Sequence, residues 1–171
     1  MAESIQCKIK QSLQTIEGLY YRLVLLVGEI GSGKTRILRD IANDYDTSVI
    51  NINLALSSEL LELTAKQRSL WLPRILAQIT DKHQSPVVLD NLEILFDNGL
   101  KQDPLRLLQG ISRNRIVVAS WKGTFTDERL LYAVTGHPEY RSYDSVDALI
   151  VCMDETITLN SEKTIAEAVP A

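Results

Sequence analysis

A glycine-rich segment directly after an apolar run constrains the fold of this chain more than any other feature. Residues 28–35 read Gly-Glu-Ile-Gly-Ser-Gly-Lys-Thr and match the pattern G-x-x-x-x-G-K-[ST], and the apolar run covers residues 23–27. Glycines let backbone N–H groups turn inward around a phosphate, because no side chains block the approach. Ile37, Leu38 and Ile41 then recur on one helical face, so a phosphate would lie at a helix N-terminus. The segment predicts a strand, a phosphate-binding loop and a helix in succession.

The residues of this loop are suited to different parts of a bound nucleotide. Lys34 places a positive charge near the β- and γ-phosphates, and the Thr35 hydroxyl is suited to ligate Mg²⁺. A glycine turn that carries a lysine by accident is the alternative, but such a chance match occurs in about one chain in a hundred or fewer. The residues expected to bind the nucleotide are Gly28, Gly31, Ser32, Gly33, Lys34, Thr35 and Arg36.

Composition narrows the class of protein. The 171 residues have room for one domain with one core, and 45% hydrophobic and 23% charged residues are ordinary for a folded protein. A net charge of -4 argues against binding DNA through bulk charge, so we expect DNA contact to be weak or indirect. The sequence has no signal-peptide pattern and no apolar run of about 18 residues, which predicts a cytoplasmic protein without membrane contact. Cys7 and Cys152 are interpreted as reduced core residues.

The alternation of apolar patterns predicts an α/β fold with a five-stranded, mainly parallel sheet between helices. Residues 1–20 are expected to form an N-terminal segment whose amphipathic helix covers residues 3–19. This helix should pack on a P-loop domain of residues 21–154, and residues 155–171 are expected to form a C-terminal tail. Further helices are predicted after the glycine loop, over 64–79 with a capping box at its start, and over 103–108. Strands are predicted over 22–27, 47–54, 87–90, 115–120 and 149–153.

Asp90 ends a buried strand and is the expected second half of the site. Its carboxylate should emerge at the sheet edge where the glycine loop lies and should help to hold Mg²⁺. A turn or helix-capping role is the alternative. Many ATPases of the additional-strand type place a glutamate directly after this aspartate, but here Asn91 stands there and the first acid is Glu93. Glu93 either turns back toward the γ-phosphate or is a solvated or capping acid.

Ser120, at the end of the fourth predicted strand, is a candidate to face the γ-phosphate between the loop and Asp90, and a turn role is equally compatible. The expected catalytic residues are therefore Lys34, Asp90, Glu93 and Ser120, and the expected metal ligands are Thr35 and Asp90. An arginine that neutralises charge in the transition state would come from Arg113, Arg115, Arg129 or Arg141, or from a neighbouring molecule.

Missing motifs argue against several classes of nucleotide-binding protein. The sequence has no N-K-x-D to read guanine, no D-x-x-G after the third predicted strand and no L-S-G-G-Q transporter signature. A nucleotide kinase would need an arginine-rich lid, which is not apparent.

The chain resembles the AAA+-like P-loop ATPases. Residues 28–35 match the Walker A motif, residues 87–90 match Walker B, and Ser120 is near the first sensor position. More narrowly, residues 19–28, 89–93 and 136–141 resemble the BrxF family, the P-loop proteins of some BREX phage-defence systems, and the resemblance covers about residues 5–153.

This resemblance implies a bacterial ATP-binding component that uses ATP and Mg²⁺ and acts with other phage-defence proteins. Only some 18 residues follow the fifth predicted strand, too few for the C-terminal helical lid of AAA+ proteins, so a homo-oligomer would form through the ATPase core. We expect a magnesium-dependent ATPase or an ATP-driven switch, with a non-hydrolysing sensor or assembly module and a small-molecule kinase as alternatives. Residues 91–102 and 121–143 are the expected moving parts, with 136–143 as a plain loop, a lid substitute or a partner-binding loop.

Overall fold

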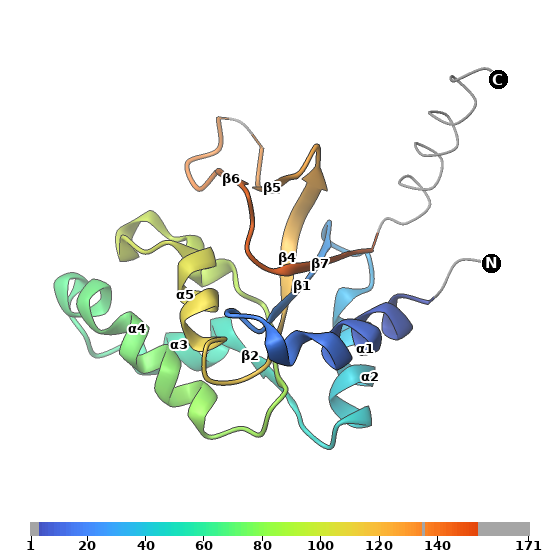
Figure 1. Ribbon diagram of the computed structural model, residues 1–171. Coiled ribbons are helices and arrows are strands. Elements are labelled where there is room, and N and C mark those ends of the chain that lie inside the picture. The colour runs from blue at the N-terminus through green and yellow to red at the C-terminus, as the bar shows by residue number, and fades with distance from the viewer. Residues whose placement is uncertain (1–3, 135, 154–171) are drawn as a thin grey trace.

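A parallel sheet of five strands forms the centre of the computed structural model, which describes residues 4–134 and 136–153 (Figure 1). The strands lie in the order β2-β3-β4-β1-β7, and every neighbouring pair in this series is parallel. Their bounds are β1 Leu23–Gly28, β2 Val49–Asn51, β3 Val87–Asp90, β4 Val117–Thr126 and β7 Leu149–Cys152. Residues of β1 and β3 are buried throughout, as expected for strands covered on both faces. The predicted α/β class is confirmed.

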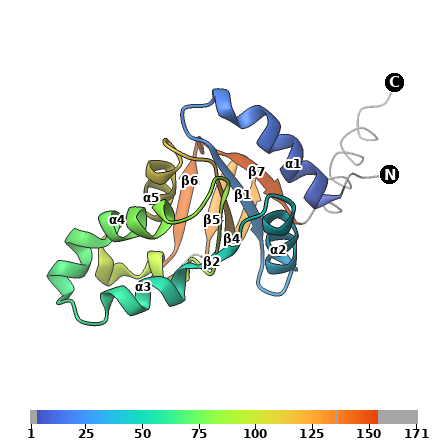
Figure 2. The same cartoon turned by 90° about the horizontal axis from the view of Figure 1, so that it is seen from below.

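Helices cover both faces of this sheet, and Figure 2 shows the two groups on opposite sides. The helices are α1 Ile5–Thr15, α2 Lys34–Asp44, α3 Ile52–Leu60, α4 Ala65–Asp81 and α5 Pro104–Ile111, with short 3-10 helices η1 Ile16–Gly18, η2 Glu93–Phe96 and η3 Asn98–Leu100. Alternate residues of β1 point to opposite faces: Leu25 packs with α3, α4 and α5, and Leu26 packs with α1 and α2. The sheet therefore separates two apolar cores.

Helix capping explains where several of these helices begin. The capping box of Thr64 and Gln67 is present at the start of α4, which then runs through Pro73 to Asp81. The Asp103 side chain accepts a hydrogen bond from the backbone N–H of Arg106 and caps α5. The predicted helix over 64–79 is thus confirmed and slightly extended.

Residues 47–54 do not form one strand, which corrects the prediction made from their apolar alternation. The strand β2 covers only Val49–Asn51, and α3 begins at Ile52. The Asn51 side chain accepts a hydrogen bond from the backbone N–H of Leu54 at 3.0 Å, so it caps a helix where the alternation suggested more strand. The N-terminal helix is also shorter than predicted, because α1 ends at Thr15 and η1 follows.

The predicted strand over 115–120 is part of a longer one. The strand β4 continues beyond the central sheet to Thr126 and pairs with β5 Arg129–Tyr132, which pairs with β6 Arg141–Asp144, both antiparallel. Over the described residues, the sheet with this extension has seven strands, two more than predicted. The two residues between β4 and β5, Asp127 and Glu128, have φ angles of 51° and 61°, the backbone of a tight hairpin turn. Residues 136–143 are thus not wholly a loop, because β6 begins at Arg141.

An aromatic cluster fixes this extension to the core. Phe96 stacks on Tyr132 with 3.5 Å between ring centroids, and Trp121 meets Phe96 edge-on at 5.1 Å. Trp121 Nε1 also donates a hydrogen bond to the Leu131 carbonyl at 3.1 Å. Because Phe96 belongs to η2 and the other rings to β4 and β5, the cluster ties the hairpin to the segment after Asp90.

Gly123 allows the close approach of β4 and β5. A Cβ atom at this position would overlap the Leu131 carbonyl oxygen, which belongs to the backbone and cannot rotate away. We predict that Gly123→Ala lowers the free energy of unfolding by about 1–3 kcal/mol, as overpacking does. Gly110→Ala in α5 is the matched control: a Cβ there meets nothing within 4 Å, and the change should raise the free energy of unfolding by about 0.5–1 kcal/mol. Urea unfolding of both variants measures the difference, and equal effects would contradict the prediction.

The prediction of two core cysteines is wrong for Cys7 and is partly confirmed for Cys152. Cys7 is exposed on α1, whereas Cys152 in β7 is half-buried and packs against one of the two apolar cores; neither is joined in a disulfide. The predicted tail, residues 155–171, and the region where a C-terminal lid was predicted to be lacking lie outside the described residues.

Candidate functional site

The glycine loop joins the end of β1 to the start of α2 and folds as its glycines require. Gly31 and Gly33 have φ angles of 77° and 98°, which side chains disfavour, and Gly33 is the N-cap of α2. At Gly28, a Cβ atom would lie 2.6 Å from Ser32 Oγ and 2.8 Å from Met153 Cγ. The loop therefore leaves the first backbone N–H groups of α2 open to an anion.

The Lys34 side chain lies against the loop itself. Its Nζ donates hydrogen bonds to the backbone carbonyls of Gly28 and Glu29, at 2.7 and 2.9 Å. Burial lowers the pKa of Lys34 from its usual 10.5, although nearby carboxylates, foremost Asp90, oppose the shift. The ammonium is thus held by weak acceptors that a phosphate would replace.

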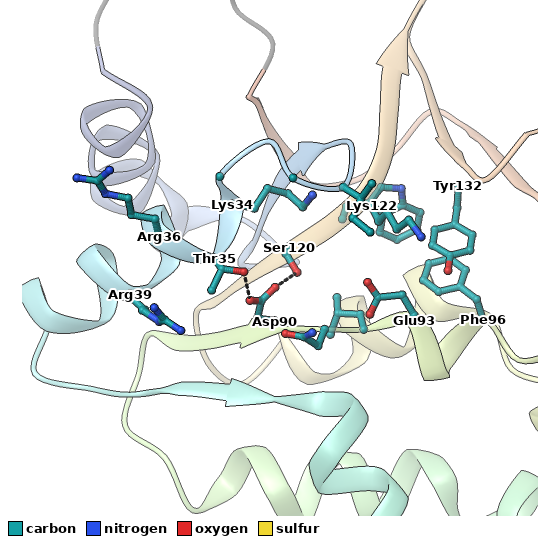
Figure 3. Close-up of a pocket in the computed structure, with 16 residues that line it drawn as sticks. Lys34, Thr35, Arg36, Arg39, Asp90, Glu93, Phe96, Ser120, Lys122 and Tyr132 are labelled. Atoms are coloured by element: carbon teal, nitrogen blue, oxygen red, sulfur yellow. Dashed lines mark hydrogen bonds between the residues drawn. The ribbon is translucent and has the colours of Figure 1, made fainter.

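Asp90 lies at the centre of a hydrogen-bonded trio (Figure 3). Its Oδ2 accepts a hydrogen bond from Thr35 Oγ1 at 2.7 Å, and its Oδ1 accepts one from Ser120 Oγ at 2.8 Å. Thr35 comes from α2, Ser120 from β4 and Asp90 from the end of β3. The sheet order explains the meeting, because β4 lies between β1 and β3 and brings Ser120 between loop and carboxylate.

The donor set of this trio fits Mg²⁺. Asp90 is only 6% exposed, and no Lys, Arg or His nitrogen of the described residues lies within the 4.0 Å of an ion pair. A buried carboxylate without a cationic partner is costly unless a cation binds it. Hydroxyl and carboxylate oxygens are ligands that Mg²⁺ prefers, usually beside substrate phosphates and water.

Glu93 reaches the same site through a helical turn. It is the first residue of η2, and its Oε2 accepts a hydrogen bond from Asn53 Nδ2 at 3.0 Å. Asn53 Oδ1 in turn accepts from the backbone N–H of Ile94 at 2.8 Å, and the Asn53 N–H donates to the Asn91 carbonyl. Asn53 therefore positions the acid and the segment that carries it. Sequence reasoning missed Asn53, because it assigned this residue to a strand.

A cavity of about 490 Å³ gathers most of the predicted residues. Its lining includes Gly31, Gly33, Lys34, Thr35, Arg36, Asp90, Glu93 and Ser120. Gly28 and Ser32 instead line a separate hollow of about 260 Å³. Arg39 and Lys122 also line the main cavity and were not predicted. Tyr132 lines it near Glu93, and burial raises its pKa to about 12, so the phenol stays neutral at physiological pH.

The four arginines considered as charge-neutralising residues lie elsewhere. Arg113 stacks over the Tyr20 ring at 4.2 Å, and Arg115 pairs with Asp81 at 2.8 Å. Arg129 pairs with Asp144, and Arg141 donates to the Gln102 carbonyl at 3.5 Å. None of the four lines the cavity.

No protein-family model matches this chain, and no curated protein matches it significantly. In the part of the chain that the structure describes, no helix is both long and apolar enough to cross a membrane. The resemblance to the BrxF family therefore stays a prediction.

Proposed function

We propose that this protein binds ATP together with Mg²⁺ in the cavity between α2 and β4 and acts as an ATPase or an ATP-driven switch. The observation that carries the proposal is the trio in which Thr35 and Ser120 both donate to the carboxylate of Asp90 beside the glycine loop. A P-loop fold of the additional-strand type fits the sheet, because one strand separates β1 from β3. A role in BREX-type phage defence, with other defence proteins as partners, rests on the sequence resemblance alone.

In this proposal, each residue of the cavity has its own role in binding ATP or in its hydrolysis. The N–H groups at the start of α2 bind the phosphates, and Lys34 exchanges the carbonyls of Gly28 and Glu29 for phosphate oxygens. Thr35 and Asp90 would hold Mg²⁺, which neutralises phosphate charge when bound. Ser120 orients the γ-phosphate, and Glu93 accepts a proton from the attacking water.

The contacts of Asn53 favour one alternative, a sensor that binds ATP without turnover. Asn53 Nδ2 donates a hydrogen bond to Oε2 of Glu93, so one of the two oxygens of this carboxylate already has a partner. Whether the protein is an ATPase or a sensor, a change of conformation requires different contacts in the ATP and ADP states, because only differential affinity shifts an equilibrium. Lys34 and Glu93 are the two side chains whose present partners would have to change.

Titration calorimetry with ATP, ADP and adenosine, each with and without Mg²⁺, tests the proposal. We expect the affinity to rise from adenosine to ATP and the preference for ATP to depend on Mg²⁺. Phosphate release measured on the same sample then separates an ATPase from a sensor. If ATP does not bind with Mg²⁺ present, the proposal is wrong.

The affinity for ATP should fall as pH rises, and the fall should begin below the pH expected of an ordinary lysine. The lowered pKa of Lys34 means that the free protein loses the ammonium proton below 10.5, whereas a bound phosphate requires the charged form. Asp90, Glu93, Glu29 and Lys122 face this amine and contribute to its pKa. Titrations from about pH 7 to about pH 10 in two buffers of different ionisation enthalpy should show proton uptake on binding. A profile that is unchanged in Lys34→Ala would contradict this assignment.

A further inference from the structure

Lys122 lines the cavity but has no role in the function proposed above. It lies two residues beyond Ser120 on β4, so both side chains lie on the same face of the strand. It is paired in register with Gly28, the last residue of β1 before the glycine loop. Because β4 continues past Ser120 to Thr126, Lys122 is held on a regular strand at the wall of the cavity.

The Lys122 ammonium has no partner of opposite charge among residues 4–134 and 136–153. No ion pair or hydrogen bond holds it there, although the side chain is half-buried. It is also close enough to Lys34 for the two charges to repel. Two half-buried ammonium groups that face one cavity are costly in the absence of an anion, and a bound anion between them removes that cost.

The other cations of the cavity lie at a different end. In Figure 3, Lys34 and Lys122 lie above the carboxylates of Asp90 and Glu93, whereas Arg36 and Arg39 lie beyond Thr35 on α2. The end of the cavity with Ser120 and Glu93 is where the terminal phosphoryl group of the proposed nucleotide would react. Lys122 is the cation on that wall that is not part of the glycine loop.

We propose that Lys122 is a catalytic residue that contacts the γ-phosphoryl group of ATP beside Lys34, an inference that rests on the proposed function. In the step, the oxygen of water forms a bond to the γ-phosphorus while the bond from phosphorus to the β–γ bridging oxygen breaks. The bridging oxygen leaves on ADP with the electron pair, and Glu93 accepts a proton of the water. Lys122 keeps its proton and stabilises the negative charge on the phosphoryl oxygens, as an arginine does in other phosphoryl-transfer proteins.

The test compares wild type, Lys122→Ala, Lys122→Arg and the control Lys66→Ala, which removes an exposed lysine of α4. Lys122→Ala should lower kcat about 10²- to 10³-fold, as loss of one preorganised charge donor does. The affinity for ADP should stay within about fivefold of wild type, because ADP lacks the group that Lys122 contacts. Lys122→Arg should recover part of kcat, and Lys66→Ala should behave as wild type.

Binding of ADP with aluminium fluoride, a mimic of the transferring phosphoryl group, gives a readout that does not require turnover. Lys122→Ala should weaken this complex about 10²-fold or more while ADP alone still binds. A structural role, in which Lys122 only offsets the charge of Glu93, would leave the ratio between the two ligands unchanged and overturn the inference. If wild type binds ATP but the variant equals it in both assays, the inference fails and the proposed function stands. If wild type binds neither ATP nor ADP, both are wrong.

Discussion

Lys34→Ala is expected to weaken the binding of ATP by about 10- to 150-fold, the equivalent of about 1.5–3 kcal/mol for a hydrogen bond to a charged group. The ammonium is aimed at the terminal phosphates, so the affinity for adenosine should be nearly unchanged. In the free protein the Lys34 Nζ is held by two backbone carbonyls of the loop. Its removal therefore alters the loop as well as the charge, and the comparison between ATP and adenosine isolates the phosphate contact.

Titration calorimetry with Mg²⁺ measures this difference, and Lys66→Ala controls for the loss of one positive charge at a distance. The thermal midpoint of each variant shows whether the fold is intact. Equal loss of affinity for ATP and adenosine would mean that Lys34 supports the shape of the loop and does not contact the phosphates. No loss for either ligand would mean that the nucleotide binds elsewhere.

The central sheet was predictable because its strands are short apolar runs that are buried on both faces. The apolar runs before Gly28 and before Asp90 show this pattern clearly. The glycine loop and Asp90 come directly after these strands, so their positions at the edge of the sheet could be predicted as well. The start of a helix could also be predicted where the sequence contains a capping motif, as at Thr64. Capping rules were insufficient at Asn51, where a cap lies within an alternating pattern that also suits a strand.

The hairpin extension could not be predicted because its turn lacks the usual residues. Asp127 and Glu128 adopt positive φ angles without a glycine, and Gly123 has its role only because Leu131 approaches from β5. Pairing between β4 and β5 and stacking between Phe96 and Tyr132 are properties of the folded chain. Sequence periodicity carries little information about such contacts.

In the candidate site, too, some residues could be predicted from the sequence and others could not. Lys34, Thr35 and Asp90 were predicted from motifs whose spacing follows from phosphate chemistry, and the structure brings them together. Asn53 and Lys122 were missed because their places depend on the folded chain: Asn53 holds the Glu93 carboxylate, and β4 continues past Ser120 and brings Lys122 to the wall of the cavity. No local pattern marks an asparagine or a lysine for such a role.

Asp90→Asn is expected to lower magnesium-dependent ATP hydrolysis by about 10²- to 10³-fold while the fold is kept. Asparagine has nearly the same shape as aspartate, and its amide can still make hydrogen bonds to the hydroxyls of Thr35 and Ser120, which now donate to the carboxylate. The stability should therefore change by about 1 kcal/mol or less, a shift of about 2–4 °C in the thermal midpoint. What is lost is the negative charge that would hold Mg²⁺.

The dependence on Mg²⁺ separates this role from a purely structural one. Without Mg²⁺, wild type and Asp90→Asn should bind ATP about equally or the variant more tightly, since one negative charge near the phosphates is gone. With Mg²⁺, only wild type should gain affinity and turnover. Asp46→Asn is the matched control, because Asp46 is exposed and has a φ angle of 55°, a conformation that asparagine tolerates. If Asp90→Asn keeps the full magnesium effect, the carboxylate serves only to join Thr35 to Ser120, and the ion must be held by other groups.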